Sequence, residues 1–196
     1  MASIIQILIH LKLFLEQFYK SYNCNTNSLY IIFLNFIDKI SNSNNAIDIK
    51  DFADKYNQIN HKFAGDKGNN PMTFLIEFIK KLSEETNENI LNLFSGKKYI
   101  KFEGMSDLNY EEDFIILLTT LNENKYLLYD SIYEEKEFED DENLKIVEEI
   151  KVKPEILVIN LEIEDIEYNF EEKIIIDGNK YFLKAINRYT NFHSTA

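Results

Sequence analysis

The sequence predicts an α+β fold, with helices in its first half and strands in its second half. Up to about residue 95, apolar residues recur at three- and four-residue spacing, which is the period of an amphipathic helix. Beyond Gly96, β-branched and aromatic residues gather in short runs bounded by Gly, Asn and Asp, which is typical of antiparallel strands. The length of 196 residues suits one domain. We therefore expect a single domain over 1–196, with a helical lobe at 1–95 and an antiparallel β-rich lobe at 96–196.

The helical lobe is predicted from apolar stripes and from the residues that begin and end helices. One stripe, made of Ile4, Leu8, Leu11, Leu15 and Phe18, predicts a helix over about 3–21 that Ser3 caps. Further helices are expected at about 28–40, 48–59 and 71–85. The last one begins at Pro71, because the first turn of a helix leaves an N–H unpaired and proline has none.

The β-rich lobe is predicted from short β-branched runs. Candidate strands are 98–102, 113–119, 145–152, 156–161, 173–176 and 180–187. The tripeptide Asp177-Gly178-Asn179 predicts a hairpin turn, because glycine tolerates the positive φ that such turns need. The acidic run 134–142 is expected to be an exposed connection, since like charges stay solvated. The segment 126–133 fits either a short helix or a strand.

Charge and cysteine content restrict the partners and the compartment. A formal net charge of −13 disfavours nucleic acid and favours a basic protein surface. The apolar N-terminal run is interrupted by polar residues, so a membrane span is not expected. Cys24 is the one cysteine, which excludes an internal disulfide and indicates an intracellular location, cytoplasmic or nuclear. Neither a cofactor nor a metal is expected.

Four blocks, in order along the chain, carry a family resemblance. They are residues 3–11, the segment 63–82 with Phe63-Ala64-Gly65 and Asn69-Asn70-Pro71, the strand 153–161 with Lys153-Pro154, and Tyr181–Tyr189 followed by His193. Their order and spacing resemble those of the ubiquitin-specific proteases. The resemblance implies a papain-like cysteine protease fold, in which the first block is the helix that follows the catalytic cysteine.

The resemblance also implies an incomplete catalytic site. In this family a cysteine thiolate attacks the isopeptide carbonyl, a histidine takes its proton, and an Asp or Asn orients that histidine. Here the nucleophile would stand at or before Met1, and the orienting residue would follow Ala196, so both are expected to be absent. His193 is the remaining catalytic candidate. It falls three positions short of the family histidine, so it is either the general base or a plain surface histidine.

Other positions of the family pattern concern the groove for the ubiquitin tail. Asn69 and Asn70 stand where the family has the Gln and Asp that line this groove, and Thr73 stands where it has Glu. The family's zinc-binding cysteine pairs have no counterpart here. A rival alignment places the nucleophile at Cys24, since Cys24-Asn25-Thr26-Asn27-Ser28-Leu29 resembles the start of the cysteine box, but it leaves the first helix without a counterpart.

Three functions follow from these observations. The first is a ubiquitin-specific protease-like domain without activity, which binds ubiquitin or another basic protein. The second is an active deubiquitinase domain, a thiol isopeptidase, whose catalytic ends lie outside these residues. The third is a generic protein-interaction domain.

Overall fold

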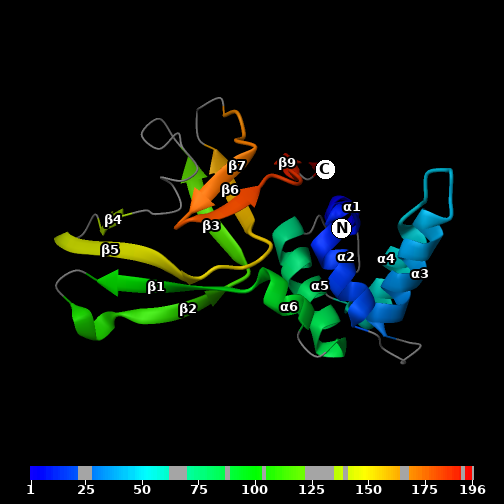
Figure 1. Cartoon of the computed structure of the whole chain (residues 1–196), viewed down its shortest axis with the longest axis horizontal. Coiled ribbons are helices and arrows are strands. Elements are labelled where there is room, and N and C mark those ends of the chain that lie inside the picture. The colour runs from blue at the N-terminus through cyan, green and yellow to red at the C-terminus, as the bar shows by residue number, and fades with distance from the viewer. Residues whose placement is uncertain are drawn as a thin grey trace. The chain divides into compact units, whose positions relative to one another are not determined.

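The computed structural model describes residues 1–21, 28–61, 70–86, 89–102, 105–121, 135–138, 141–163, 168–190 and 193–195. They form two compact units (Figure 1). The first unit contains Met1–Leu91 and Lys184–Ala196 and is mainly helical. The second unit contains Asn92–Leu183 and is mainly β-sheet. The predicted α+β class is confirmed. The segment 126–133, for which the sequence allows a short helix or a strand, lies outside the described residues.

The helices of the described residues follow the apolar periods of the sequence. They are α1 (Ala2–His10), α2 (Lys12–Lys20), α3 (Leu29–Ser41), α4 (Lys50–Ile59), α5 (Pro71–Glu85) and α6 (Asn89–Phe94). The bounds of α5 are those predicted, and Pro71 occupies its first turn. The short α6 was not predicted.

The single helix predicted over 3–21 is wrong, because it breaks at Leu11. Leu11 is extended, with φ −84° and ψ 99°, and its N–H donates to the Leu8 carbonyl at 3.1 Å. The break changes the buried face from Ile4, Ile5 and Leu8 in α1 to Phe14 and Phe18 in α2. The predicted cap is also wrong: Met1 is the N-cap, and Ser3 is buried within the first turn.

An aromatic core holds α2, α3, α4 and α5 together. Phe33 of α3 lies at its centre, with ring centroids 6.0 Å from Phe14, 5.2 Å from Phe18, 5.9 Å from Phe52 and 5.1 Å from Phe78. Offset and edge-to-face ring pairs contribute about 0.5–1.5 kcal/mol each beyond the area they bury. Packing of this kind makes the helical unit depend on residues that are far apart in the sequence.

Tyr56 of α4 links this core to the pH dependence of stability. Burial raises the pKa of Tyr56 to about 12, although a hydrogen bond from the Asn60 amide lowers it in part. The folded pKa lies above the unfolded value of about 10, so the fold favours the neutral phenol. We expect the free energy of unfolding to fall by roughly 2 kcal/mol as the pH rises from 10 to 12. Urea denaturation at several pH values measures this.

The control for this prediction is Tyr56→Phe, which removes the ionisable group and keeps the ring. Lysines and exposed tyrosines titrate equally in both proteins, so the difference between the two curves isolates Tyr56. Parallel curves from pH 10 to pH 12 would contradict the prediction.

A long-range carboxylate contact fixes the start of α3. Both oxygens of Glu85, in the last turn of α5, accept backbone N–H groups, from Leu29 at 3.1 Å and Tyr30 at 2.9 Å. Ser28 caps the same helix end by accepting the Ile31 N–H at 3.3 Å. The N-terminus of a helix leaves such N–H groups unpaired and carries a partial positive charge. The Glu85 carboxylate accepts hydrogen bonds from these groups and also balances the charge.

The described strands of the second unit form three sheets. Their bounds are β1 (Gly96–Phe102), β2 (Tyr110–Phe114), β3 (Ile116–Leu121), β4 (Glu135–Phe138), β5 (Asp141–Val152), β6 (Val158–Ile163), β7 (Lys173–Ile176) and β8 (Asn179–Phe182). The order β2-β1-β5-β4 is antiparallel, and β7 pairs with β8 as the predicted hairpin. Asp177 and Gly178 form its turn with φ of 42° and 84°.

Four details differ from the predicted all-antiparallel lobe. Strand β3 pairs with β6 in parallel, which a long intervening segment permits. The run predicted at 113–119 bends at Ile115, so β2 pairs with β1 and β3 pairs with β6. The acidic run is not only a connection, because Glu135–Phe138 pairs with β5, where the register places Glu137 opposite Lys145. The strand predicted at 180–187 stops at Phe182.

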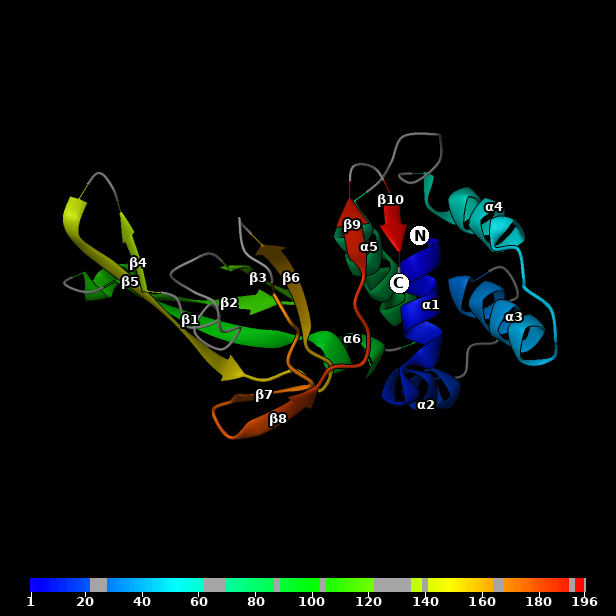
Figure 2. The same ribbon diagram turned by 90° about the horizontal axis from the view of Figure 1, so that it is seen from above.

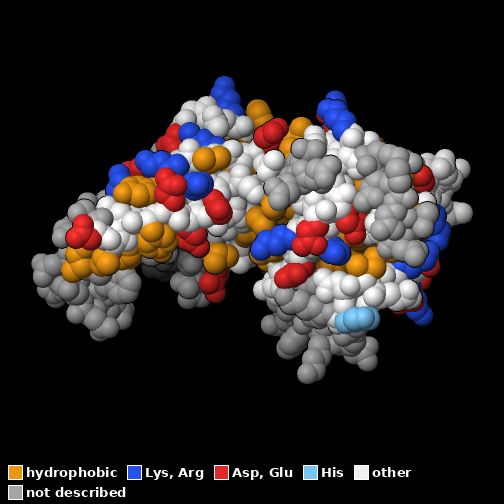
Figure 3. All heavy atoms as spheres, turned by 90° about the horizontal axis from the view of Figure 1, so that it is seen from below, with side chains coloured by type: hydrophobic (Ala, Val, Ile, Leu, Met, Phe, Trp, Pro, Cys, Tyr) orange, Lys and Arg blue, Asp and Glu red, His pale blue; other side chains and the backbone are white. Residues whose placement is uncertain are grey.

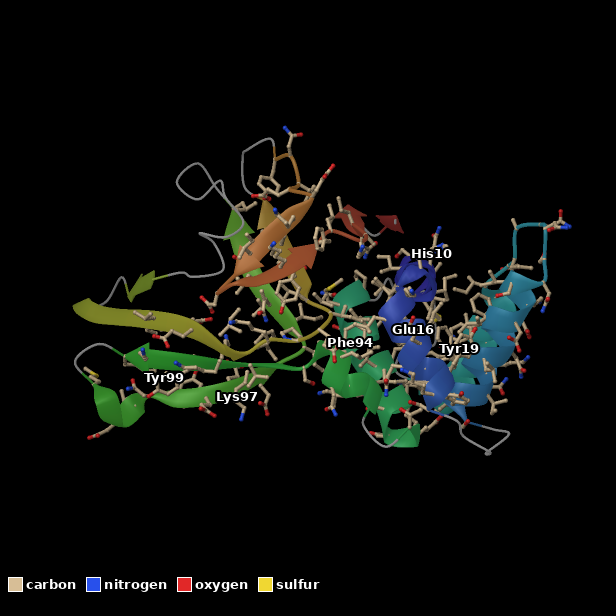
Figure 4. All side chains as sticks on the ribbon, viewed as in Figure 1. His10, Glu16, Tyr19, Phe94, Lys97 and Tyr99 are labelled. Atoms are coloured by element: carbon tan, nitrogen blue, oxygen red, sulfur yellow. The ribbon has the colours of Figure 1, made fainter. Side chains whose placement is uncertain are left out.

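Charges on the four-stranded sheet largely neutralise one another. Lys98 lies 3.1 Å from Glu148 and 3.3 Å from Glu112, and Lys97 lies 3.3 Å from Glu111. Hydrogen bonds from Lys101 and Lys151 lower the pKa of Glu149 to about 2. Figure 3 shows the resulting mixture of acidic, basic and hydrophobic side chains over the strands, and Figure 4 marks Lys97 and Tyr99 on β1.

The second unit has its own apolar core. Phe114, Leu117 and Ile176 are buried in it, and Ile150, Leu157, Ile159, Ile174 and Tyr181 pack against them. The Tyr181 hydroxyl donates to the Pro154 carbonyl at 2.7 Å, which joins β8 to the segment before β6. Alternate residues of the β7–β8 hairpin therefore face this core, and the others face away from it.

Candidate functional site

A short C-terminal hairpin lies beside the start of the chain. Strands β9 (Arg188–Thr190) and β10 (His193–Thr195) pair antiparallel, with His193 opposite Thr190. Both belong to the first unit, and two perpendicular views place the hairpin next to the N-terminal end of α1 (Figures 1 and 2). Neither strand was predicted. The structure thus brings the strand of His193 and the first helix together, across almost the whole sequence.

The helix end at this site carries no cysteine. Met1, Ala2 and Ser3 form it, and the Met1 carbonyl accepts the Ile5 N–H at 3.1 Å. Cys24, which the rival alignment takes as the nucleophile, lies outside the described residues. The role of the His193 imidazole stays a prediction. The other two histidines, His10 and His61, are exposed, and Figure 4 marks His10 at the end of α1.

Asn70 has a structural role that the sequence pattern did not reveal. Its side-chain oxygen accepts the backbone N–H groups of Met72 at 2.8 Å and Thr73 at 3.4 Å, so it is the N-cap of α5. The predicted role of Asn70 in a ubiquitin-tail groove therefore depends on its amide nitrogen, because the oxygen already serves the helix. Asn69, the other predicted groove residue, lies outside the described residues.

The cap gives a testable expectation for Asn70→Ala. Loss of the cap leaves two N–H groups without their acceptor, so the free energy of unfolding should fall by about 1 kcal/mol. Thermal unfolding followed by circular dichroism measures the change. Asn70→Asp is the matched control, because a carboxylate caps equally well and suits the positive helix end. An equal loss in both variants would contradict the capping role.

Asn187 is a further polar residue at this site that sequence reasoning missed. It directly precedes β9, and both its Oδ1 and its Nδ2 are buried without a hydrogen bond in the described part of the chain. A buried unpaired polar group costs about 1–3 kcal/mol. A peptide main chain supplies both a donor and an acceptor, which is what this amide lacks. No sequence pattern could have found it, since its burial depends on the fold.

The described residues contain no group of three or more His, Cys, Asp or Glu side chains placed to hold a metal ion. None of the described helices combines the length and the apolarity needed to cross a membrane.

The fold is similar to that of solved deubiquitinase-module structures. A chain of the SAGA DUB module of Ubp8, Sgf11, Sgf73 and Sus1 matches with a TM-score of 0.63 and 16% identity, covering 97% of this chain and 48% of that chain. A second structure of this module, with altered components, matches with a TM-score of 0.57 and 17% identity. The match covers 93% of this chain and 47% of that chain. The chain therefore spans about half the length of the chains it matches. At this identity the likeness is one of fold. No protein-family model and no curated protein matches the sequence.

Proposed function

We propose that this chain is a deubiquitinase-like, protein-binding domain that binds ubiquitin or another protein with a basic surface and does not cleave it. The observation that carries the proposal is the fold likeness to chains of a deubiquitinase module, over nearly all of this sequence. The net charge of −13 favours a basic partner, because opposite fields speed encounter and exclude wrong partners. The single cysteine suits a reducing, intracellular setting.

We propose a papain-like arrangement for this site, in which a helix N-terminus and a histidine-bearing strand face each other. The position of β10 beside the start of α1 supports this arrangement. Cysteine protease chemistry needs a thiolate at the helix end, which attacks the carbonyl while an imidazole takes the proton. Met1–Ser3 provide no thiol there. Binding without hydrolysis is therefore what we propose for the residues of this chain.

Asn187 and Asn70 are the residues we assign to binding in this site. Both polar atoms of the Asn187 amide are buried without a hydrogen bond in the described part of the chain, so the amide would gain a donor and an acceptor on the extended tail of a bound protein only where binding opens the segment before β9. The Asn70 oxygen caps α5, so this residue would contribute its amide nitrogen as a donor to the same kind of ligand. Both contacts are to main-chain atoms, so they select an extended peptide and not a particular side chain.

The test is a titration of isotopically labelled ubiquitin with the full 196-residue chain, followed by NMR, together with a fluorogenic ubiquitin substrate. Saturable binding that weakens with salt, without turnover, is the expected result. Asn187→Ala should weaken binding about five- to tenfold without lowering stability, because it removes an unpaired amide. Asn57→Ala is the control, since the Asn57 oxygen in α4 is buried and has no hydrogen bond within the described residues. Absence of ubiquitin binding would overturn the proposal in favour of a generic interaction domain.

The closeness of β10 to α1 also favours a second function, an active thiol isopeptidase domain whose catalytic ends lie outside these residues. Turnover of the fluorogenic substrate by this polypeptide would overturn the first function and would show that a complete catalytic site lies within these residues. Turnover lost in Cys24→Ala would identify Cys24 as the nucleophile, whereas turnover lost in His193→Ala would identify the base. A Cys24→Ala protein that keeps its activity would exclude the rival alignment.

A further inference from the structure

The outer face of the β7–β8 hairpin combines exposed apolar and basic side chains. The register places Lys173 opposite Phe182 and Ile175 opposite Lys180, so these four residues share one face. Phe182 is 59% exposed and Ile175 is 43% exposed. Ile174, Ile176 and Tyr181 point the other way, into the core of the second unit. The four outer residues, Lys173, Ile175, Lys180 and Phe182, are called the hairpin face below.

The two lysines of the hairpin face differ from the other lysines whose side chains are described in the second unit. Those others are paired with carboxylates: Lys97, Lys98, Lys101, Lys151 and Lys153. Within the described residues, no ion pair involves Lys173 or Lys180. Of the carboxylates flanking the hairpin, Asp177 pairs with Lys153 at 3.6 Å and Glu171 accepts the Tyr168 hydroxyl, whereas the exposed Glu172 forms no ion pair with a lysine among the described residues. In a chain of net charge −13, this small face has positive charge available to a partner.

The arrangement on the face defines the chemistry that matches it. Lys173 and Lys180 are diagonal neighbours across the two strands, and Ile175 and Phe182 occupy the other diagonal. Diagonal neighbours lie about 7–8 Å apart, so the like charges repel each other weakly and an anionic group between them is favourable. A ligand that alternates a carboxylate with an apolar side chain on one face would satisfy both diagonals together.

We propose that the hairpin face is a docking site for an acidic segment of a partner protein that carries exposed apolar side chains. This is a second binding surface, and its charge preference is opposite to that proposed for ubiquitin. An anionic membrane is the weaker alternative, because lipid-binding clusters contain about four to eight basic residues and the chain as a whole is strongly acidic. Exposed aromatic side chains such as Phe182 are typical of the apolar anchors of protein interfaces.

The test uses a fluorescent peptide in which Glu and Leu alternate at every second position with Ser between them, so that both types share a face when extended. Fluorescence anisotropy should show salt-sensitive binding to the wild-type chain. The matching peptide with Lys in place of Glu should not bind. Phe182→Ala should raise the Kd about tenfold or more, and Lys173→Glu with Lys180→Glu should abolish measurable binding.

Matched variants separate this site from general charge and folding effects. Lys50→Glu with Lys80→Glu changes the net charge equally on exposed positions of α4 and α5 and should leave peptide binding unchanged. Leu118→Ala removes a 76% exposed side chain from β3 and should also leave it unchanged. Circular dichroism confirms that each variant folds. Ubiquitin binding should be insensitive to Phe182→Ala, so the two proposals fail independently.

Five outcomes would overturn this inference. Equal binding of the Glu and Lys peptides would remove the charge preference, and no binding of either peptide would remove the site. Peptide binding that persists in the Lys173→Glu, Lys180→Glu double variant would place the site elsewhere. Phosphatidylserine vesicles that bind in preference to the peptide would identify a membrane surface. Self-association that Phe182→Ala abolishes, measured by sedimentation, would identify a second copy of the chain as the occupant.

Discussion

Phe33→Ala is expected to lower the free energy of unfolding by about 4 kcal/mol, measured by urea denaturation. The Phe33 ring is fully buried and contacts rings from α2, α4 and α5, at centroid distances between 5.1 and 6.0 Å. Truncation removes the apolar transfer energy of the ring and leaves a cavity that three helices cannot all move to fill. The loss is a large fraction of the stability of a typical domain.

Phe33→Leu and Leu13→Ala are the controls for this experiment. Leucine keeps most of the buried volume, so we expect a loss of about 1–2 kcal/mol, with edge-to-face ring contacts accounting for part of it. Leu13 is 39% exposed on α2, and its truncation should cost less than about 1 kcal/mol. If Phe33→Ala cost no more than Leu13→Ala, the aromatic core would not be what holds these helices together.

The parts of the fold that could be predicted from the sequence are those determined locally. Helix α5 begins and ends where the apolar spacing and Pro71 predict, and α3 and α4 agree within two residues. The β7–β8 hairpin follows from Asp177-Gly178, because the positive φ of this turn is a local property. In each case the stabilising contacts lie within a few residues of one another.

The parts that could not be predicted depend on distant contacts. The break at Leu11 exists because Phe14 and Phe18 must pack on α3, which the spacing of the apolar stripe alone does not encode. The parallel pairing of β3 with β6 joins segments separated by two other strands. Hairpin β9–β10 is very short, and its neighbour α1 is at the other end of the sequence.

The candidate site shows the same division between local and distant information. The family resemblance connected the first helix with His193, and the structure brings the strand of His193 beside that helix. The resemblance gave Asn70 a binding role and did not reveal that it caps α5. Asn187 was missed because an unpaired buried amide is recognised only once its surroundings are known.

Gly96→Ala is expected to destabilise the chain by about 2 kcal/mol or more, although alanine is ordinarily the better strand residue. In a strand interior, glycine is less stable than alanine by about 0.5–1 kcal/mol, so backbone entropy alone predicts that Gly96→Ala stabilises the chain.

Steric contact with Phe114 reverses this expectation. A Cβ on Gly96 would lie 2.6 and 2.8 Å from Cε1 and Cε2 of the Phe114 ring. Gly96 and Phe114 are directly opposite in the β1–β2 register. Overpacking a buried site costs about 1–3 kcal/mol and occasionally more, and Phe114 cannot yield easily because it is part of the core with Leu117 and Ile176.

A double-mutant cycle with Phe114→Ala separates two contributions to the effect of Gly96→Ala on the free energy of unfolding: the steric clash with the ring and the backbone entropy of glycine. Phe114→Ala alone should cost about 3 kcal/mol, because Phe114 is buried among its core partners, with a relative exposure of 7%. With that ring removed, Gly96→Ala should become neutral or stabilise by about 0.5–1 kcal/mol, since the backbone preference is all that remains. The sign of the Gly96→Ala effect would therefore reverse between the two backgrounds. Equal losses in both backgrounds would show that Gly96 is required for its backbone conformation and that the Phe114 ring does not occupy the space above it.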